Sequence, residues 1–250
     1  MRFFLEIAYK GTRYHGWQIQ ENAHSVQQEI NNNLSKLFGE VTTMGSGRTD
    51  TGVHAEQQFI QLDLEVPFTQ EHLRKLNTML PKDIAIKNFF GVRANASARH
   101  DPLYRSYEYR ICKVKNPFAA ELAYYYSRPL DILEMNLAAN MLLAHSDFQS
   151  FSKVKTSVDH FLCQIHEAYW QDTGELLVFT ITGNRFLRGM VRAIVGTLLN
   201  IGLGRISAKD FEAIIIAKDR NAAGQSAPPQ GLFLTRIAYP PEIFIDCHVE

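Results

Sequence analysis

Apolar side chains alternate with polar ones along several short stretches of the chain, and this two-residue period predicts β-strands. The first stretch covers residues 2–9, whose apolar side is formed by Phe3, Leu5, Ile7 and Tyr9. Further strands are expected at residues 60–66, 84–92, 99–113, 161–170, 175–182 and 232–239. Asp172-Thr-Gly174 separates the fifth and sixth of these seven strands, which is typical of a hairpin.

Between the strands, apolar residues recur with the 3.6-residue period of amphipathic helices. Helices are expected at residues 25–39, 69–80, 131–145 and 186–202, and from residue 207 onwards. Ser25, Asp131 and Ser207 stand where side chains commonly cap the first turn. In the helix at 186–202, Arg188 and Arg192 are four residues apart and are expected on one face.

Strands and helices alternate in both halves of the chain, roughly residues 1–105 and 106–250. This rhythm predicts an α+β fold, and its repetition favours two ferredoxin-like units that share an antiparallel sheet.

The segment Gly45–Ala55 stands out for its chemistry, because three glycines within eight residues allow backbone turns that a Cβ would forbid. Arg48 and Asp50 lie two residues apart in this bend and can converge on one point. A guanidinium beside a carboxyl group lowers its pKa and keeps it ionised, as a carboxylate nucleophile requires. On spacing alone, however, an ordinary Gly- and Asp-rich turn is the favoured interpretation.

The amino-acid composition narrows the possible classes of protein and its cellular compartment. The chain has 250 residues, of which 46% are apolar, and this fits a globular core. We expect neither a membrane span nor a signal peptide, because no apolar run is long enough and the first residues have a strand pattern. The scattered Cys112, Cys163 and Cys247 indicate a reducing cytoplasm rather than disulfides or zinc, and the histidines show no metal-like clustering.

The formal net charge is zero, which by itself argues against a nucleic-acid partner. The charge is unevenly distributed, however. Residues 176–209 contain no acid but five cations, and residues 84–115 contain seven cations against two acids. A basic face on a neutral protein is therefore one interpretation, and solvated surface charges are an equally good one.

The segment Gly45–Ala55 closely resembles the G-x-G-R-T-D-x-G-V-H-A signature of the tRNA pseudouridine synthase A family. Thr51 replaces the alanine that is usual in the family. Further blocks resemble the family along almost the whole chain: Y-x-G-W-Q at 14–18, A-R-x(7)-Y-x-Y at 98–109, D-F-x-S-F at 147–151, F-L-x-x-M-V-R-x-I-V-G at 186–196 and A-P-x-x-G-L at 227–232.

The resemblance implies two RRM-like halves, each with helices on one side of a central antiparallel sheet, that face one another across a cleft. It implies an isomerase that converts uridine to pseudouridine in the anticodon stem-loop of tRNA, at the positions conventionally numbered 38, 39 and 40. It further implies a cytoplasmic homodimer with tRNA across both subunits, no cofactor or metal, and no DNA or membrane partner.

By the same resemblance, Asp50 attacks the nucleoside or stabilises its cleavage, and attack on the base and attack on C1′ both stay open. Arg48 would hold the flipped nucleotide open, and Tyr107 would stack on the uracil and assist proton removal. Arg192 lies in an apolar helix and needs a carboxylate partner, for which Asp50 is the candidate. The expected substrate-binding residues are Arg48, His54, Arg105, Tyr107 and Arg188.

Three alternatives stand beside this hypothesis. A non-catalytic RNA-binding protein would use the same basic and aromatic residues, and a related synthase would modify other tRNA positions. A phosphatase-like enzyme with Asp50 as nucleophile is disfavoured, because its Asp normally follows an apolar strand and Met44–Thr49 is not one. The Tyr14–Trp17 loop could contact a planar ligand or pack into the core, and Tyr107 could be a core residue of its strand.

Overall fold

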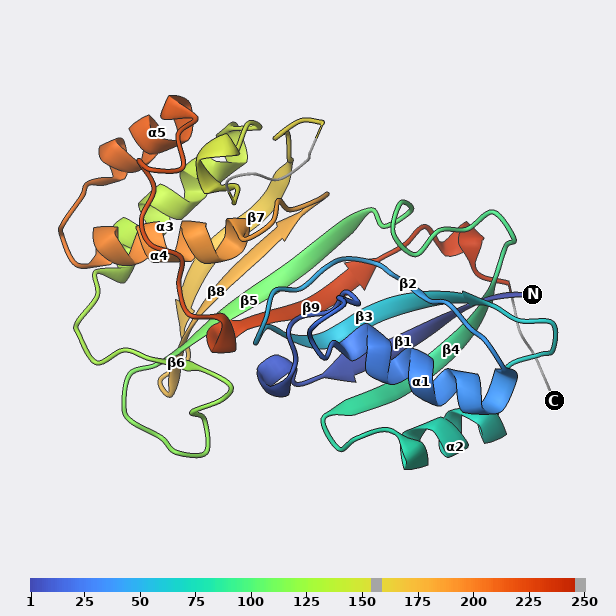
Figure 1. Ribbon diagram of the computed structural model, residues 1–250. Coiled ribbons are helices and arrows are strands. Elements are labelled where there is room, and N and C mark those ends of the chain that lie inside the picture. The colour runs from blue at the N-terminus through green and yellow to red at the C-terminus, as the bar shows by residue number, and fades with distance from the viewer. Residues whose placement is uncertain (154–158, 246–250) are drawn as a thin grey trace. The chain divides into compact units, whose positions relative to one another are not determined.

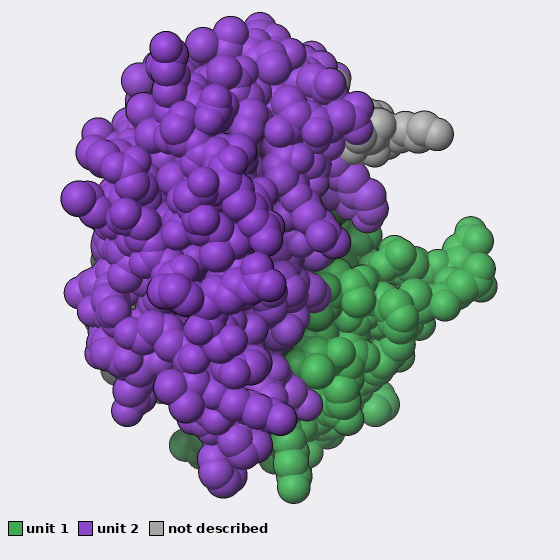
Figure 2. All heavy atoms as spheres, turned by 90° about the vertical axis from the view of Figure 1, so that its left-hand side faces the viewer, with its two compact units in different colours: residues 1–103, 234–250 green, residues 104–233 purple. Residues whose placement is uncertain are grey.

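The computed structural model describes residues 1–153 and 159–245 and shows an α+β protein (Figure 1). The chain forms two compact units, coloured separately in Figure 2. Unit 1 comprises Met1–Leu103 and Leu234–Glu250, and unit 2 comprises Tyr104–Phe233. The C-terminal segment therefore belongs with the first residues of the chain, whereas the sequence-based division placed it in the second half. The functional assignment of the two halves stays a prediction.

In unit 1, strand pairing follows the order β4-β1-β3-β9, and the short β2 also pairs with β3. The strands are β1 (Arg2–Tyr9), β2 (Met44–Gly45), β3 (His54–Asp63), β4 (Ile84–Val92) and β9 (Leu232–Ala238), of which β9 begins in unit 2. Helices α1 (Val26–Phe38) and α2 (Gln70–Met79) contact each other, and α2 packs on β4. The core of this unit includes Phe4, Leu5, Ile7, Ile30, Leu34 and Ile60, all at most 1% exposed.

In unit 2, the pairing order is β5-β8-β7, and the two-residue β6 lies beside β5. Its elements are β5 (Tyr104–Cys112), β6 (Tyr124–Tyr125), α3 (Ile132–Met141), β7 (Ile165–Asp172), β8 (Leu176–Gly183), α4 (Met190–Gly202) and α5 (Ala208–Ala217). Helix α3 contacts β7 and both other helices. Short 3-10 helices follow at Leu142–Ala144, Gln149–Phe151 and Pro229–Gly231, and in unit 1 at Gly11–Arg13 and Pro241–Ile243.

The predicted helix caps are confirmed. Ser25 and Asp131 each accept a hydrogen bond from a backbone N–H in the first turn of their helix, at 3.2 and 3.0 Å. At Ser207 the capping box is complete, because Asp210 also accepts a bond from the Ser207 N–H at 2.8 Å. Each bond satisfies a helix-end donor that would otherwise lack a partner.

The expectation of an antiparallel sheet is confirmed only in part. The pairs β1–β3, β1–β4, β2–β3, β5–β8 and β7–β8 are antiparallel, but β6 runs parallel to β5. The strand expected at residues 60–66 is also displaced. It begins at His54, because Ala55 already pairs with Tyr9 of β1, and it ends at Asp63. The Gly-rich segment consequently leads directly into a strand.

The helix expected at residues 186–202 begins only at Met190. Gly189 precedes it with φ of 73°, in the left-handed region, and this conformation interrupts the helix. Arg188 therefore lies outside α4 and does not share a helical face with Arg192, so that prediction is wrong. Within the described residues, we find no helix that combines the length and the apolar character needed to cross a membrane.

The close approach of α4 to the segment around Gln225 gives a stability prediction. A glycine-to-alanine change inside a helix normally stabilises it by up to about 1 kcal/mol. At Gly196, however, a Cβ would lie 1.8 Å from the Gln225 carbonyl oxygen. We expect Gly196→Ala to lower the free energy of unfolding in urea titrations, whereas Asn32→Ala, on an exposed position of α1, should leave it unchanged or raise it slightly. Stabilisation by Gly196→Ala would contradict the close packing.

Candidate active site

The Gly-rich segment is tied to β3 at its beginning. Gly45 pairs with Ile60, and the buried Ser46 then donates its N–H to the Phe59 carbonyl at 2.9 Å. The Phe59 N–H in turn donates to the Ser46 hydroxyl at 3.3 Å. One residue further, the Gly47 carbonyl accepts a bond from the Gln58 side chain at 3.2 Å. These bonds fix the path of the backbone toward Arg48 and Asp50.

Thr49 is the anchor directly before Asp50. Its side chain is buried, and its hydroxyl shares a hydrogen bond of 2.8 Å with the Tyr9 hydroxyl at the end of β1. Its carbonyl accepts the N–H of Trp17 at 3.2 Å. Tyr9 and Trp17 also stack on one another, with ring centroids 6.1 Å apart. The residue before Asp50 is thus held through both its side chain and its backbone.

After Asp50 the chain makes a turn that is held from a second side. The Asp50 carbonyl accepts the Val53 N–H at 3.1 Å, and Gly52 in this turn has φ of 77°. The Gly52 N–H points to the Tyr14 carbonyl at 3.4 Å. Asp50 itself is half-buried, while Arg48 and Thr51 are exposed. The bend therefore presents Asp50 from a backbone that is fixed on both sides.

Residues 11–17 pack directly against the bend around Asp50. A Cβ at Gly11 would lie 1.9 Å from the Val53 carbonyl oxygen, and one at Gly16 would lie 2.5 Å from that of Thr49. Only glycine permits such contacts between two backbones. Tyr14 and Trp17 are 2% and 1% exposed. Of the two alternatives for this aromatic loop, the structure shows core packing and not exposure to a planar ligand.

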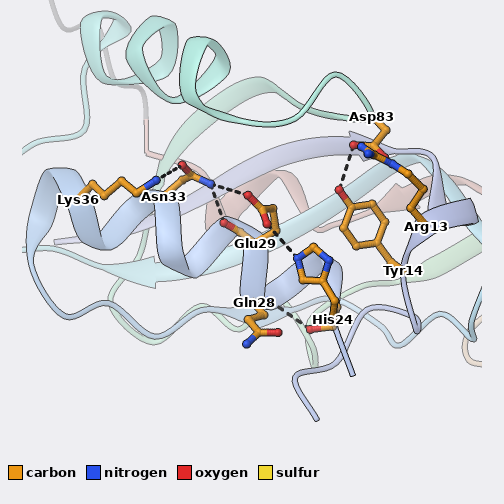
Figure 3. A network of polar contacts seen from close by, with 9 residues as sticks. Arg13, Tyr14, His24, Gln28, Glu29, Asn33, Lys36 and Asp83 are labelled. Carbon is orange, nitrogen blue, oxygen red and sulfur yellow. Dashed lines mark hydrogen bonds and ion pairs between the residues drawn. The ribbon is translucent and has the colours of Figure 1, made fainter. Parts of the chain in front are cut away.

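A polar network holds residues 11–17 in place (Figure 3). The Tyr14 hydroxyl donates to Asp83 at 2.9 Å, and Arg13 donates to the other oxygen of the same carboxylate at 2.7 Å. Burial, together with the Asp83 carboxylate, raises the pKa of the Tyr14 hydroxyl well above its usual value, so that it stays a donor. The Tyr14 ring also packs on His24, which contacts Glu29 of α1 at 2.9 Å. The loop is thereby joined to α1 and to the segment before β4.

His54 contacts the loop of residues 11–17. Its side chain is 1% exposed, and its Nδ1 accepts the Gly11 N–H at 3.0 Å. This nitrogen therefore carries no proton, and the ring helps to hold residues 11–17 against the Gly-rich segment. The predicted substrate contact of His54 stays a prediction, but its observed contact is a structural one.

In unit 2, Tyr107 lies on β5 opposite Ile181 and is 8% exposed. Its ring meets Phe186 edge to face, with centroids 5.1 Å apart. Arg105, two residues earlier, donates from Nη1 to the Asn184 carbonyl at 2.9 Å. The strand β5 and the segment after β8 thus place two of the predicted substrate-binding residues in one region of unit 2.

Arg192 holds the segment Ala227–Leu232 against α4. Its Nε donates to the Ala227 carbonyl at 2.7 Å, and the Ala227 N–H donates back to the Arg192 carbonyl at 2.9 Å. The buried Tyr109 hydroxyl donates to the next carbonyl, that of Pro228, at 2.8 Å. Arg192 is half-buried, so a backbone carbonyl meets part of the demand that the sequence assigned to a carboxylate.

The candidate residues fall into two sets. Arg48, Asp50 and His54 belong to unit 1, and Arg105, Tyr107, Arg188 and Arg192 belong to unit 2. Arg188 is exposed, and its carbonyl accepts the Lys153 N–H at 3.0 Å. The pairing of Arg192 with Asp50 joins the two sets and stays a prediction.

Sequence reasoning missed Tyr9, Gly11 and Thr49 as parts of the site. Their contacts are long-range, and only Thr49 stands inside the signature. The glycines at positions 11 and 16 were the available signal, because glycine beside a catalytic loop often marks a close backbone approach.

The described residues offer no candidate metal site. Within residues 1–153 and 159–245, no group of three or more His, Cys, Asp or Glu side chains could hold a metal ion. Cys112 and Cys163 are buried and free, and Cys247 lies outside the described residues.

The bond between Tyr9 and Thr49 can be tested by a double-mutant cycle. Tyr9→Phe and Thr49→Val each leave one buried hydroxyl without this partner, so each should lower the free energy of unfolding by about 1–2 kcal/mol. The double variant should lose clearly less than the two losses added together, because it leaves neither partner behind. Chemical denaturation measures all three values. Additive losses would show that the bond does not stabilise the segment before Asp50.

Comparison with known proteins gives this site its context. The family model described as tRNA pseudouridine synthase matches residues 138–240. A tRNA pseudouridine synthase A of Porphyromonas gingivalis is 45% identical over 98% of this chain and 99% of its own length. The proteins of the same name from Bacteroides fragilis and Exiguobacterium sibiricum are 45% and 37% identical, over 97% and 96% of this chain and 98% and 97% of their own lengths. Because these relatives match nearly the full length of the chain, the chain belongs to the tRNA pseudouridine synthase A family.

Proposed function

We propose that this protein is an isomerase that converts uridine to pseudouridine in tRNA. Membership of the family supports the reaction and the substrate. The structural observation that carries the proposal is the fixed backbone around Asp50, which is bonded to Tyr9 and Trp17 through Thr49 and closed by the turn to Val53. A fixed backbone beneath a single carboxylate is the kind of arrangement that covalent or electrostatic catalysis needs.

The reaction breaks the bond between N1 of uracil and C1′ of ribose and forms a bond between C5 and C1′. The proton on C5 is lost, and N1 gains one, so substrate and product are isomers. No electron or group comes from outside, and we therefore propose that no cofactor takes part. The uridine must leave its stack before any side chain can reach it.

We assign the roles as follows. Asp50 attacks the nucleoside, at the base or at C1′, and Arg48 holds the flipped nucleotide open. Tyr107 stacks on the uracil and assists loss of the C5 proton, and its packing on Phe186 supports an orienting role for that pair of rings. Arg192 pairs with Asp50 and holds the carboxylate in position. Arg105, Arg188 and His54 complete the substrate-binding set.

We further propose the finer features that the family resemblance implies. The targets are positions 38, 39 and 40 in the anticodon stem-loop, and the active form is a cytoplasmic homodimer across which the tRNA lies. Each unit corresponds to one ferredoxin-like, or RRM-like, half, and the two halves face one cleft. The alternation of strands and helices inside each unit supports this description.

The decisive variant is Asp50→Asn, which keeps the size of the side chain and removes its charge. Activity should fall by about 10⁴-fold or more, as for other lost nucleophiles, while tRNA affinity and melting temperature stay near those of the wild type. Release of tritium from tRNA labelled at C5 of uridine measures the reaction. Thr51→Ala, in the same bend and exposed, is the matched control and should keep full activity.

Substantial turnover by Asp50→Asn would remove Asp50 from the role of nucleophile. A wild-type protein that binds tRNA but releases no tritium would instead favour the non-catalytic RNA-binding alternative.

Arg192→Met tests the pairing of Arg192 with Asp50. The proposed ion pair would hold the Asp50 carboxylate in position for attack, and a misplaced catalytic group can cost about 10²-fold in rate. Tritium release by the variant should therefore be slower by about that factor, while its tRNA affinity stays near that of the wild type. The variant also loses the bond to the Ala227 carbonyl, so its melting temperature is measured in parallel. Activity that falls only in proportion to the loss of folded protein would leave Arg192 as a structural residue.

A further inference from the structure

A cavity of about 480 Å³ lies in unit 2, at the point where β8 ends and β7 begins. Its polar lining consists of His145, Ser146, His160, Gln164, Asn184 and Arg185. Only Asn184 and Arg185 belong to the basic segments noted in the sequence, and the other lining residues come from two further stretches of the chain, so the cavity is a feature that only the fold reveals.

The walls of the cavity are held together by backbone and amide contacts. The Asn184 N–H donates to the Gln164 carbonyl at 3.0 Å, and the Gln164 N–H donates to the Asn184 side-chain oxygen at 2.8 Å. The Cys163 N–H donates to the Ser146 carbonyl at 2.8 Å. The three wall segments are therefore fixed relative to one another before any ligand arrives.

The charge in this cavity is positive. Arg185 lies with Nη1 3.2 Å from both ring nitrogens of His160, and no Asp or Glu side chain is among the described residues of the lining. Burial raises the pKa of the Cys163 thiol to about 11, so this group is neutral at physiological pH.

Two acids lie beside the lining of the cavity, one against a lining residue and one paired outside it. Glu212 lies 3.5 Å from His145, and Asp147 forms an ion pair of 2.8 Å with Lys218. Among the described lining residues, Arg185 carries the permanent charge, and its planar guanidinium suits the oxygens of a phosphate group.

The cavity adjoins the residues to which we assign the target base. Arg185 directly precedes Phe186, whose ring packs on Tyr107, and Asn184 accepts the hydrogen bond from Arg105. A nucleotide that stacks on Tyr107 carries phosphates on both sides of its ribose, within one nucleotide of the base.

From these observations we propose that the cavity is a subsite for one phosphate of the RNA backbone near the target uridine, bound by Arg185 and flanked by His160. The proposal rests on the function proposed above. It adds a contact that positions the RNA strand and carries no base specificity of its own.

The test combines one protein variant with a neutral replacement of single phosphates. An anticodon stem-loop RNA is prepared as a series in which each backbone phosphate in turn is a methylphosphonate, and binding is measured by fluorescence anisotropy. For wild-type protein, one position near the target uridine should weaken binding about tenfold. For Arg185→Gln, the unmodified RNA should already bind about tenfold more weakly, and the same methylphosphonate should add no further loss. The slope of log K against log salt should also fall by about one.

Arg74→Gln serves as the control, because it removes the same charge from an exposed position of α2 and should change neither affinity nor slope. If Arg185→Gln does not fold, as judged by its melting temperature, His160→Gln from the exposed opposite wall replaces it in the same series.

The proposal is overturned if no methylphosphonate position loses its effect in the variant, or if Arg185→Gln binds like Arg74→Gln. Failure of the proposed function has a different signature, because the wild-type protein would then release no tritium from the stem-loop, whether or not it binds it.

Discussion

The site depends on the direct contact between two backbones, that of residues 11–16 and that of residues 49–53. The contact requires the absence of a side chain at Gly11 and Gly16, where a Cβ would lie 1.9 and 2.5 Å from carbonyl oxygens. It places the hydrogen bonds of Thr49 and Gly52 on either side of Asp50. Because the backbone is bonded on both sides of Asp50, the position from which its side chain leaves the chain is fixed.

Unit 2 also contains a close approach of two backbones, between α4 and the segment around Gln225. Gly196 lets α4 approach the Gln225 carbonyl closely, and Arg192 and Tyr109 bind two successive carbonyls of the segment that follows. Arg192 thus has an observed structural contact beside the catalytic role that we propose for it. A guanidinium held at Nε by the backbone keeps its other nitrogens in a defined plane, which suits recognition of a carboxylate.

The sequence predicted most elements, because their apolar periods and caps are local signals. It failed where the deciding feature leaves no apolar period, and where the contact joins residues far apart in the chain. The start of α4 was misplaced because the left-handed Gly189 breaks an apolar period that continues through it, and β6 has too few residues to leave a pattern. The signature pointed to Asp50 and Arg48, but it could not show that Tyr9 and the loop before α1 hold this segment, since residues far apart in the chain make those contacts. The cavity beside Arg185 was equally invisible, because its walls come from three separate segments.

We propose that this chain makes pseudouridine in tRNA. The most direct measurement is to map pseudouridine at single-nucleotide resolution in tRNA from cells that lack the protein and from the same cells supplied with it again. The account predicts that uridines at positions 38, 39 and 40 stay unmodified without the protein and are converted when it returns. An unchanged pseudouridine pattern in its absence would contradict the account.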